Sequence, residues 1–210
     1  MNHNSSTKYK AQPRLRERLR EATHDAILEA AEQAFAKEGV HEARMETIAQ
    51  AAGVAVGTLY NHFADRSALL GALLKTRAEQ LTEGIDECLA RTASEPFVDQ
   101  LRAVVEVSQS SLYSDGCVRI LMDGEALQLA KASNPAVFMK HLQARLDLLI
   151  NRGIAAGAFR SEDSQFFAWF ILSGIRSLTV RRLKGEATEP PEVAREALVR
   201  FLMHGMESRK

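Results

Sequence analysis

The stretch that decides the fold is residues 45–66, METIAQAAGVAVGTLYNHFADR. Apolar side chains recur at helical spacing on both sides of Gly53, a residue that tolerates the left-handed backbone in which many helices end. These apolar residues are Ile48, Ala49, Ala52, Leu59 and Phe63. The pattern predicts two short helices joined by a tight turn. This is the plan of a helix-turn-helix, whose second helix enters the major groove of DNA.

The residue order within this stretch is more specific than its helical pattern. Ala52–Gly53–Val54 at the turn, Gly57–Thr58–Leu59–Tyr60 in the second helix and the closing His62–Phe63 stand at the spacing of the TetR (tetracycline repressor) family of bacterial transcription regulators, which the chain closely resembles. The resemblance covers about residues 15–75. It implies a three-helix DNA-binding head and a larger helical domain that binds an effector and forms a dimer.

Helical periodicity continues through the rest of the chain and predicts an all-α fold. We expect a disordered basic arm over 1–14, a helix-turn-helix domain over 15–66, and a helical effector-binding and dimerisation domain over 67–210. Ser67 is the expected N-cap of a long connecting helix that leaves the head. Phe35 and Val40 are expected to fill the core of the head together with Ile48, Leu59 and Phe63. The other helices are predicted at 15–38, 96–112, 117–131, 135–156, 163–184 and 190–206.

Charge is distributed unevenly along a chain of zero formal net charge. Residues 1–20 hold six basic side chains and one acidic side chain, a local charge of +5, so the remaining residues carry −5. Positive charge beside a helix-turn-helix is the electrostatic signature of a nucleic-acid-binding protein. Two interpretations of the arm stay open: a solvated tail, or a segment that reaches phosphates or the minor groove.

The resemblance assigns DNA contacts to particular positions. The small side chains at the base-reading positions cannot form bidentate hydrogen bonds, so readout is expected through thymine methyl groups and DNA shape. Arg44 and Met45 replace the threonine or serine with which the family commonly begins this helix, so side-chain capping is in doubt and Arg44 is expected to reach DNA instead. Arg66 replaces the usual lysine and is expected to pair with phosphate. The predicted DNA-binding residues are Arg44, Thr47, Ala55, Val56, Gly57, Thr58, Tyr60, Asn61, His62 and Arg66.

The carboxyl-terminal helices supply candidates for two further sites. Their apolar stripes are core or pocket lining; the resemblance favours a pocket, with Gln109 and Asp123 as further polar residues that could orient a ligand. The predicted pocket residues are Leu101, Val105, Leu121, Phe138, His141, Leu142, Phe166 and Phe170. Residues 163–184 are apolar on nearly every side, which fits either a buried monomer helix or a dimer interface. The predicted interface residues are Phe167, Trp169, Ile171, Gly174, Leu178, Leu198, Phe201 and Leu202.

The expected function is that of a homodimeric transcription regulator, a repressor released from a palindromic operator on double-stranded DNA by a small, largely apolar effector. The alternative is a redox-responsive regulator that switches through Cys88 or Cys117, although buried lone cysteines are usually inert. Enzyme activity, a metal site and a cofactor are not expected, since the chain has no HExxH spacing, glycine-rich phosphate loop or nucleophile motif. Without a signal-peptide pattern or an apolar run of membrane-spanning length, we expect a cytoplasmic protein with no membrane partner.

Overall fold

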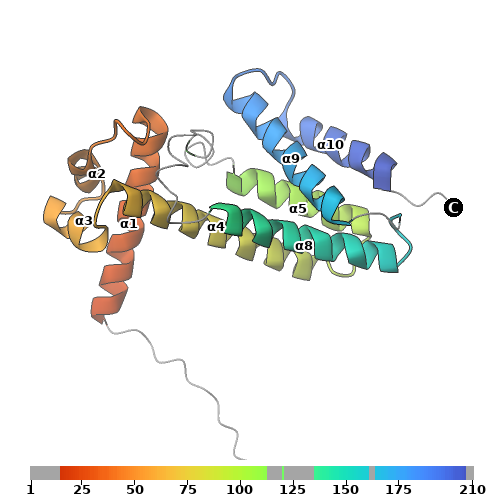
Figure 1. The fold of residues 1–210 in the computed structure, drawn as a ribbon, viewed down its shortest axis with the longest axis horizontal. Coiled ribbons are helices and arrows are strands. Elements are labelled where there is room, and N and C mark those ends of the chain that lie inside the picture. The colour runs from red at the N-terminus through yellow and green to blue at the C-terminus, as the bar shows by residue number, and fades with distance from the viewer. Residues whose placement is uncertain (1–14, 113–119, 121–134, 161–163, 207–210) are drawn as a thin grey trace, which may run out of the picture.

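The computed structural model describes residues 15–112, 120, 135–160 and 164–206, which form eight helices and no strand. In Figure 1 the amino-terminal helices gather at one end, a long helix leads away from them, and the carboxyl-terminal helices form a bundle at the other end. The all-α prediction is confirmed, and the bounds predicted for the helices that lie in these ranges agree with the observed ones to within one or two residues. The helices are α1 (Leu15–Glu38), α2 (Met45–Ala51), α3 (Val56–His62), α4 (Arg66–Arg91), α5 (Phe97–Leu112), α8 (Pro135–Ala155), α9 (Ser164–Leu183) and α10 (Pro191–Met206).

The first three helices enclose a small hydrophobic core. Phe35 and Val40 are buried against Ile48, Leu59 and Phe63, as the sequence predicts. Several alanines on α1, among them Ala30 and Ala31, are buried in the same cluster, and their small side chains allow α2 to pack close to α1.

Helix α4 belongs to two cores. Leu69, Leu70, Leu73 and Leu74 are buried in the core of the head, whereas Leu81 and Ile85, two turns further on, are buried in the core of the second domain. The packing therefore places the first two turns of α4 with the head, although the sequence suggested a boundary at residue 66.

The second domain packs α4, α5, α8, α9 and α10 around one apolar core. Ion pairs join neighbouring helices at its surface: Arg145 on α8 donates two hydrogen bonds to Asp86 on α4 at 2.8 and 2.7 Å, and Arg102 on α5 bonds Glu196 on α10 at 2.7 Å. None of the helices in the described ranges combines the length and the apolar character needed to cross a membrane.

One local prediction is wrong. The N-cap of α4 is Asp65, whose Oδ1 accepts a hydrogen bond from the backbone N–H of Ala68 at 2.8 Å, and Ser67 lies inside the first turn. The helix begins two residues earlier than a cap at Ser67 would place it, because the aspartate side chain is positioned to bond the free N–H groups of the first turn. The predicted arm over 1–14 and most of the predicted helix over 117–131 lie outside the described residues.

Candidate DNA-binding surface, effector site and dimer face

A Schellman turn separates α2 from α3. Gly53 adopts φ +69°, its N–H bonds the carbonyl of Gln50 at 3.1 Å, and the N–H of Val54 bonds the carbonyl of Ala49 at 3.0 Å. These two hydrogen bonds are the pair that closes a helix with a left-handed residue. Val54 then packs against the core of the head, so the turn fixes the direction in which α3 leaves α2.

Helix α3 is buried on one side only. Leu59 is completely buried, and Phe63, just beyond the helix, is nearly so. The other side of α3 and its N-cap reach solvent, with Tyr60 exposed to 45 % and Thr58 partly exposed. The predicted contact residues of this segment that are exposed are Ala55, Val56, Gly57, Tyr60 and Asn61. The structure therefore brings these five predicted contact residues onto one accessible helix and its N-cap.

The predicted contacts that flank α3 differ in orientation. Arg44 is the N-cap of α2 and makes no side-chain cap hydrogen bond, in line with the doubt raised by the sequence; its side chain and that of Thr47 are exposed. Arg66 instead turns toward the protein: its Nη1 donates to the carbonyl oxygen of His41, and its buried Nε has no hydrogen-bond partner among the described residues. Arg66 thus ties the start of α4 to the loop before α2.

His62 closes α3 against α1. Its ring centroid lies 6.2 Å from that of His24, whose ring in turn lies 5.1 Å from that of Phe63. Burial lowers the pKa of His62 below its ordinary value of 6.5, and the nearby charges of Arg20 and His24 act in the same direction. The imidazole is therefore neutral at pH 7, and a neutral ring can still donate one hydrogen bond.

Two polar side chains of α5, Ser108 and Gln109, are buried without a hydrogen-bond partner among the described residues. Ser108 and Gln109 continue the buried stripe of α5 formed by Leu101, Val104 and Val105, one turn further along the helix. Ser108 Oγ and both polar atoms of the Gln109 amide are buried, and none of them has a hydrogen-bond partner within the described ranges. A buried polar group left in this state costs about 1–3 kcal/mol, so the stripe is suited to a ligand that can bond it.

The predicted pocket residues separate into three groups. Leu101, Val105 and Leu142 are buried in the second core, and the first two lie on the same stripe of α5 as this polar pair. Leu121 lies outside the described residues, as do the side chains of Phe138 and His141 and the further polar candidate Asp123.

Phe166 and Phe170 do not line the interior. They are exposed to 55 % and 36 %, and their rings stack on each other with centroids 6.2 Å apart on the outer side of α9. That part of the pocket prediction is wrong, because a helix that is apolar on nearly all sides does not reveal which of its residues face inward.

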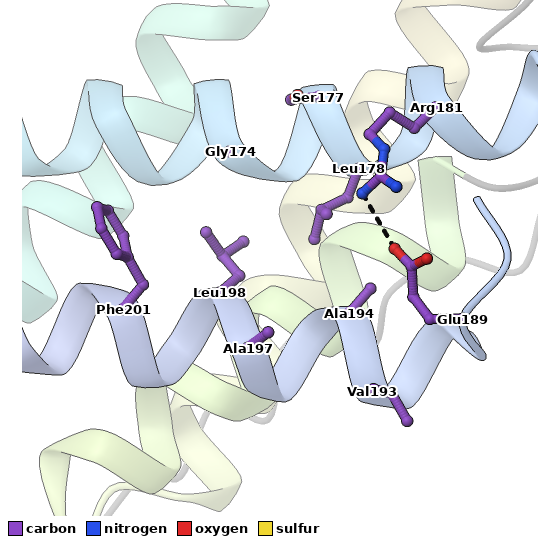
Figure 2. Close-up of a pocket in the computed structure, with 10 residues that line it drawn as sticks. All are labelled: Gly174, Ser177, Leu178, Arg181, Glu189, Val193, Ala194, Ala197, Leu198 and Phe201. Atoms are coloured by element: carbon purple, nitrogen blue, oxygen red, sulfur yellow. Dashed lines mark hydrogen bonds and ion pairs between the residues drawn. The ribbon is translucent and has the colours of Figure 1, made fainter. Parts of the chain in front are cut away.

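The α9–α10 pair forms an exposed face with a groove in it. Figure 2 shows the groove between the two helices, with Gly174, Ser177 and Leu178 on one wall and Ala194, Ala197 and Leu198 on the other. Its volume is about 420 Å³, and the ion pair between Arg181 and Glu189 (3.0 Å) lies at the end nearest the α9–α10 turn.

Most predicted interface residues lie on this face. Gly174, Leu178, Leu198 and Phe201 line the groove, and Trp169 is exposed on α9. Phe167 is partly buried and packs against the second core.

Two predicted interface residues are interior instead. Ile171 is completely buried and Leu202 is 3 % exposed, both in the second core. They hold α9 and α10 onto the bundle, and the prediction that they face a second subunit is wrong.

Comparison with known proteins agrees with this geometry. Residues 27–73 match the family described as bacterial regulatory proteins, tetR family, a range that contains α2, α3 and the adjoining parts of α1 and α4. The matched range contains the helix-turn-helix with its exposed α3, so this part of the chain is a DNA-binding domain of the kind that transcription regulators carry. Residues 27–73 therefore resemble the DNA-binding region of the TetR family.

Similar proteins extend the likeness beyond the head. The chain is 28 % identical over 138 residues to the fatty acid metabolism regulator protein of Bacillus subtilis, a match that covers 64 % of this chain and 69 % of the relative. It is 34 % identical over 87 residues to the transcriptional activator FasR of Mycolicibacterium smegmatis, covering 41 % of this chain but only 39 % of that protein.

A solved structure shows the same fold over nearly the whole chain. FadR from Bacillus subtilis, solved in complex with stearoyl-CoA, superimposes with a TM-score of 0.73 at 22 % identity. The superposition covers 87 % of this chain and 98 % of FadR.

Proposed function

We propose that this protein is a homodimeric repressor that binds a palindromic operator through α3 and leaves it when a largely apolar effector enters the second domain. The observation that carries the proposal is the recognition surface. Leu59 anchors α3 from beneath, while Tyr60 and the small residues around Gly57 stay accessible. A two-fold dimer would present two such helices to successive major grooves of a palindrome.

The proposed contacts divide into base-reading and phosphate-binding roles. The residues from Ala55 to Gly57 offer no side-chain hydrogen bond, so they select sequence through methyl contacts and groove shape. Tyr60 and Thr58 offer hydroxyl groups for phosphates, and the exposed Arg44 offers a guanidinium group. We also retain Thr47, Asn61, His62 and Arg66 as contacts; for Arg66, binding to phosphate requires that its guanidinium leave the His41 carbonyl.

Selection on random DNA duplexes tests the operator. The purified protein should enrich a palindrome, and Tyr60→Ala should lose most of that enrichment. Glu79→Ala, on an exposed position of α4, is the matched control and should behave as the wild type. If no palindrome is enriched, and binding to any duplex fails at every salt concentration, the DNA-binding role of α3 is refuted.

For the effector we propose a long-chain acyl-CoA. A relative named for fatty acid metabolism and the stearoyl-CoA complex of a protein with the same fold support this chemical class. The second core of this chain supports it independently. Apolar side chains such as Leu101 and Leu142 suit an acyl chain, and the Gln109 amide, which has no hydrogen-bond partner among the described residues, suits a carbonyl or amide group of the thioester end.

Stearoyl-CoA is the probe for this part of the proposal. It should release the enriched duplex at micromolar concentration, whereas free coenzyme A should not. Gln109→Leu should fold and bind DNA normally yet require more stearoyl-CoA for release. Equal release by coenzyme A alone, or no effect of stearoyl-CoA on either protein, rejects the acyl-CoA class while leaving the DNA-binding role intact.

The direction of regulation needs a separate readout, since one relative is named as an activator. Deleting the gene should raise transcription from the operator, and lowered transcription would make the protein an activator. The redox alternative finds no support at Cys88, which is buried and whose thiol pKa is raised by that burial. Cys117 lies outside the described residues.

A further inference from the structure

The amino-terminal half of α1 lies outside the core of the head. The first buried residue of this helix is Ile27, and the large apolar side chains before it, Leu15 and Leu19, are exposed to 70 and 59 %. Leu15 and Ile27 are twelve residues apart, which is about 18 Å along the helix. Figure 1 shows this part of α1 extending past α2 and α3. Residues 15–26 therefore form a projecting segment of helix, none of whose side chains is buried.

One side of the projecting segment is basic. Arg16, Arg20 and His24 follow one another at four-residue spacing, so they form a basic row along the helix, and both arginines are exposed. The row leads to α3, because the ring centroid of His24 lies 6.2 Å from that of His62. The positive charge of Arg20, one turn earlier, also contributes to the lowered pKa of His62. The basic row is thus continuous with the predicted DNA-binding surface on α3.

The other side of the projecting segment is largely acidic. Arg18 is separated by about half a turn from both arginines of the basic row. Its neighbours on that side are Glu21 and Asp25, which are exposed as Arg18 is and offset its charge. Glu17 lies between the two sides, beside Arg20. Even with this carboxylate counted, the two guanidinium groups of the basic row give that side a net positive charge.

The length of the basic row fits a DNA duplex. Arg16 and His24 are eight residues apart, about 12 Å along α1, and the major groove of B-DNA is about 12 Å wide. A row that starts beside the end of α3 and runs this far outward can reach the sugar–phosphate backbone that borders the groove. Guanidinium groups form charge-assisted hydrogen bonds with phosphate oxygens, and an exposed arginine row on a helix is suited to that role.

We propose that Arg16 and Arg20 bind the phosphate backbone of the same duplex that α3 reads, and so extend the contact of each subunit beyond its half of the operator. The inference rests on the proposed DNA-binding function of α3 and adds a second element to it. Phosphate contacts carry no sequence information of their own. The two arginines therefore strengthen binding to every duplex and leave the preferred sequence unchanged.

A salt titration with a matched control tests the proposal. Fluorescence anisotropy measures binding to the duplex that the wild type enriches, extended by flanking base pairs. Arg16→Ala and Arg20→Ala should each weaken binding about tenfold at low salt and reduce the slope of log K against log salt by about 1 for each subunit. Arg18→Ala removes the same side chain from the same segment and should bind as the wild type does. Alanine favours helix, so all three variants should keep their helix content in circular dichroism.

Two further measurements separate phosphate binding from a general loss of charge. Arg20→Lys should retain most of the affinity because an ammonium group also binds phosphate, whereas Arg20→Gln should behave as Arg20→Ala does. Trimming the duplex to the palindrome alone should weaken binding of the wild type. The same trimming should have little effect on the double variant Arg16→Ala/Arg20→Ala, because that protein has already lost the flanking contact.

The possible outcomes distinguish this inference from the function on which it rests. Equal losses for Arg16→Ala, Arg20→Ala and Arg18→Ala, or an unchanged salt slope in the first two, would overturn the inference and leave DNA binding by α3 standing. A double variant that enriches a different palindrome would show that these arginines read bases, which would overturn their assignment to phosphate. A wild-type protein that binds no duplex at any salt concentration would remove the proposed function and the inference together.

Discussion

Replacing Arg77 with methionine should destabilise the protein by separating α4 from α1. Arg77 Nε donates to Glu32 Oε2 at 2.9 Å, Nη2 donates to the same oxygen, and Nη1 donates to Gln80 Oε1 at 2.8 Å. The Glu32 side chain is 10 % exposed, so loss of the guanidinium leaves a carboxylate in a largely dry position between the head and the connecting helix.

The size of the effect follows from this burial. Removing one partner of a fully buried ion pair costs about 3–5 kcal/mol, whereas an exposed pair contributes about 0–1 kcal/mol. Because the Arg77 side chain is 30 % exposed and water can reach part of the site, we expect about 2 kcal/mol. For a chain of this length, that loss corresponds to a fall in Tm of about 4–8 °C.

Thermal and urea unfolding of three variants measure it. Lys75→Met is the control on the same helix: Lys75 and Glu79 are 3.8 Å apart with side chains 71 and 59 % exposed, and the loss should stay below about 0.5 kcal/mol. The double variant Glu32→Met/Arg77→Met should recover most of the stability, since no charge is left buried. If Arg77→Met costs no more than Lys75→Met, the ion pair does not hold α1 to α4 and the reasoning fails.

Three further predictions concern the head. Leu59→Ala should lower the free energy of unfolding by about 2–5 kcal/mol, because Leu59 is completely buried beneath α3; urea unfolding measures this, and a loss below about 1 kcal/mol would contradict the anchoring role. Asp65→Ala should cost about 1 kcal/mol by removing the cap of α4, while Ser67→Ala should cost little; equal losses in thermal unfolding would argue against the observed cap. The pKa of His62 is lowered in the folded protein, so near pH 6.5 the unfolded chain binds more protons than the folded one. His62 therefore contributes stability above that pH, and this contribution is lost as the pH falls. His62→Asn should flatten the dependence of the urea midpoint on pH, and an unchanged slope would refute the lowered pKa of His62.

Much of the head could be predicted from the sequence because its signals are local. Gly53 marks a left-handed helix end, and the four-residue spacing of Leu59 and Phe63 identifies the buried side of the second helix; both follow from the geometry of one or two turns. The inward orientation of Arg66 could not be predicted, because its partner is the backbone carbonyl of His41. Every residue has a backbone carbonyl, so the sequence does not indicate which one will accept a hydrogen bond. The choice of Asp65 over Ser67 as cap was equally hidden, since both residue types are good caps.

The second domain was less predictable for a different reason. Phe166, Trp169 and Ile171 are all large and apolar, yet two of them face solvent and one is completely buried. When a helix is apolar on nearly all sides, periodicity no longer separates the side that faces the bundle from the side that faces a partner. Only the three-dimensional packing makes that distinction. It places Phe166 on the surface and not in the expected pocket, and Ile171 in the core and not at the expected interface.

The membership of α4 in both hydrophobic cores has a consequence for protein engineering. A chimeric regulator is usually imagined as one head joined to another effector domain at the end of the helix-turn-helix. In this chain a junction at residue 66 would leave Leu69, Leu70, Leu73 and Leu74 to a foreign helix and would open the core of the head. The head that is transferred should therefore include α4 as far as Leu74. The junction between the two parent proteins should lie between Leu74 and Leu81, where α4 passes from one core to the other.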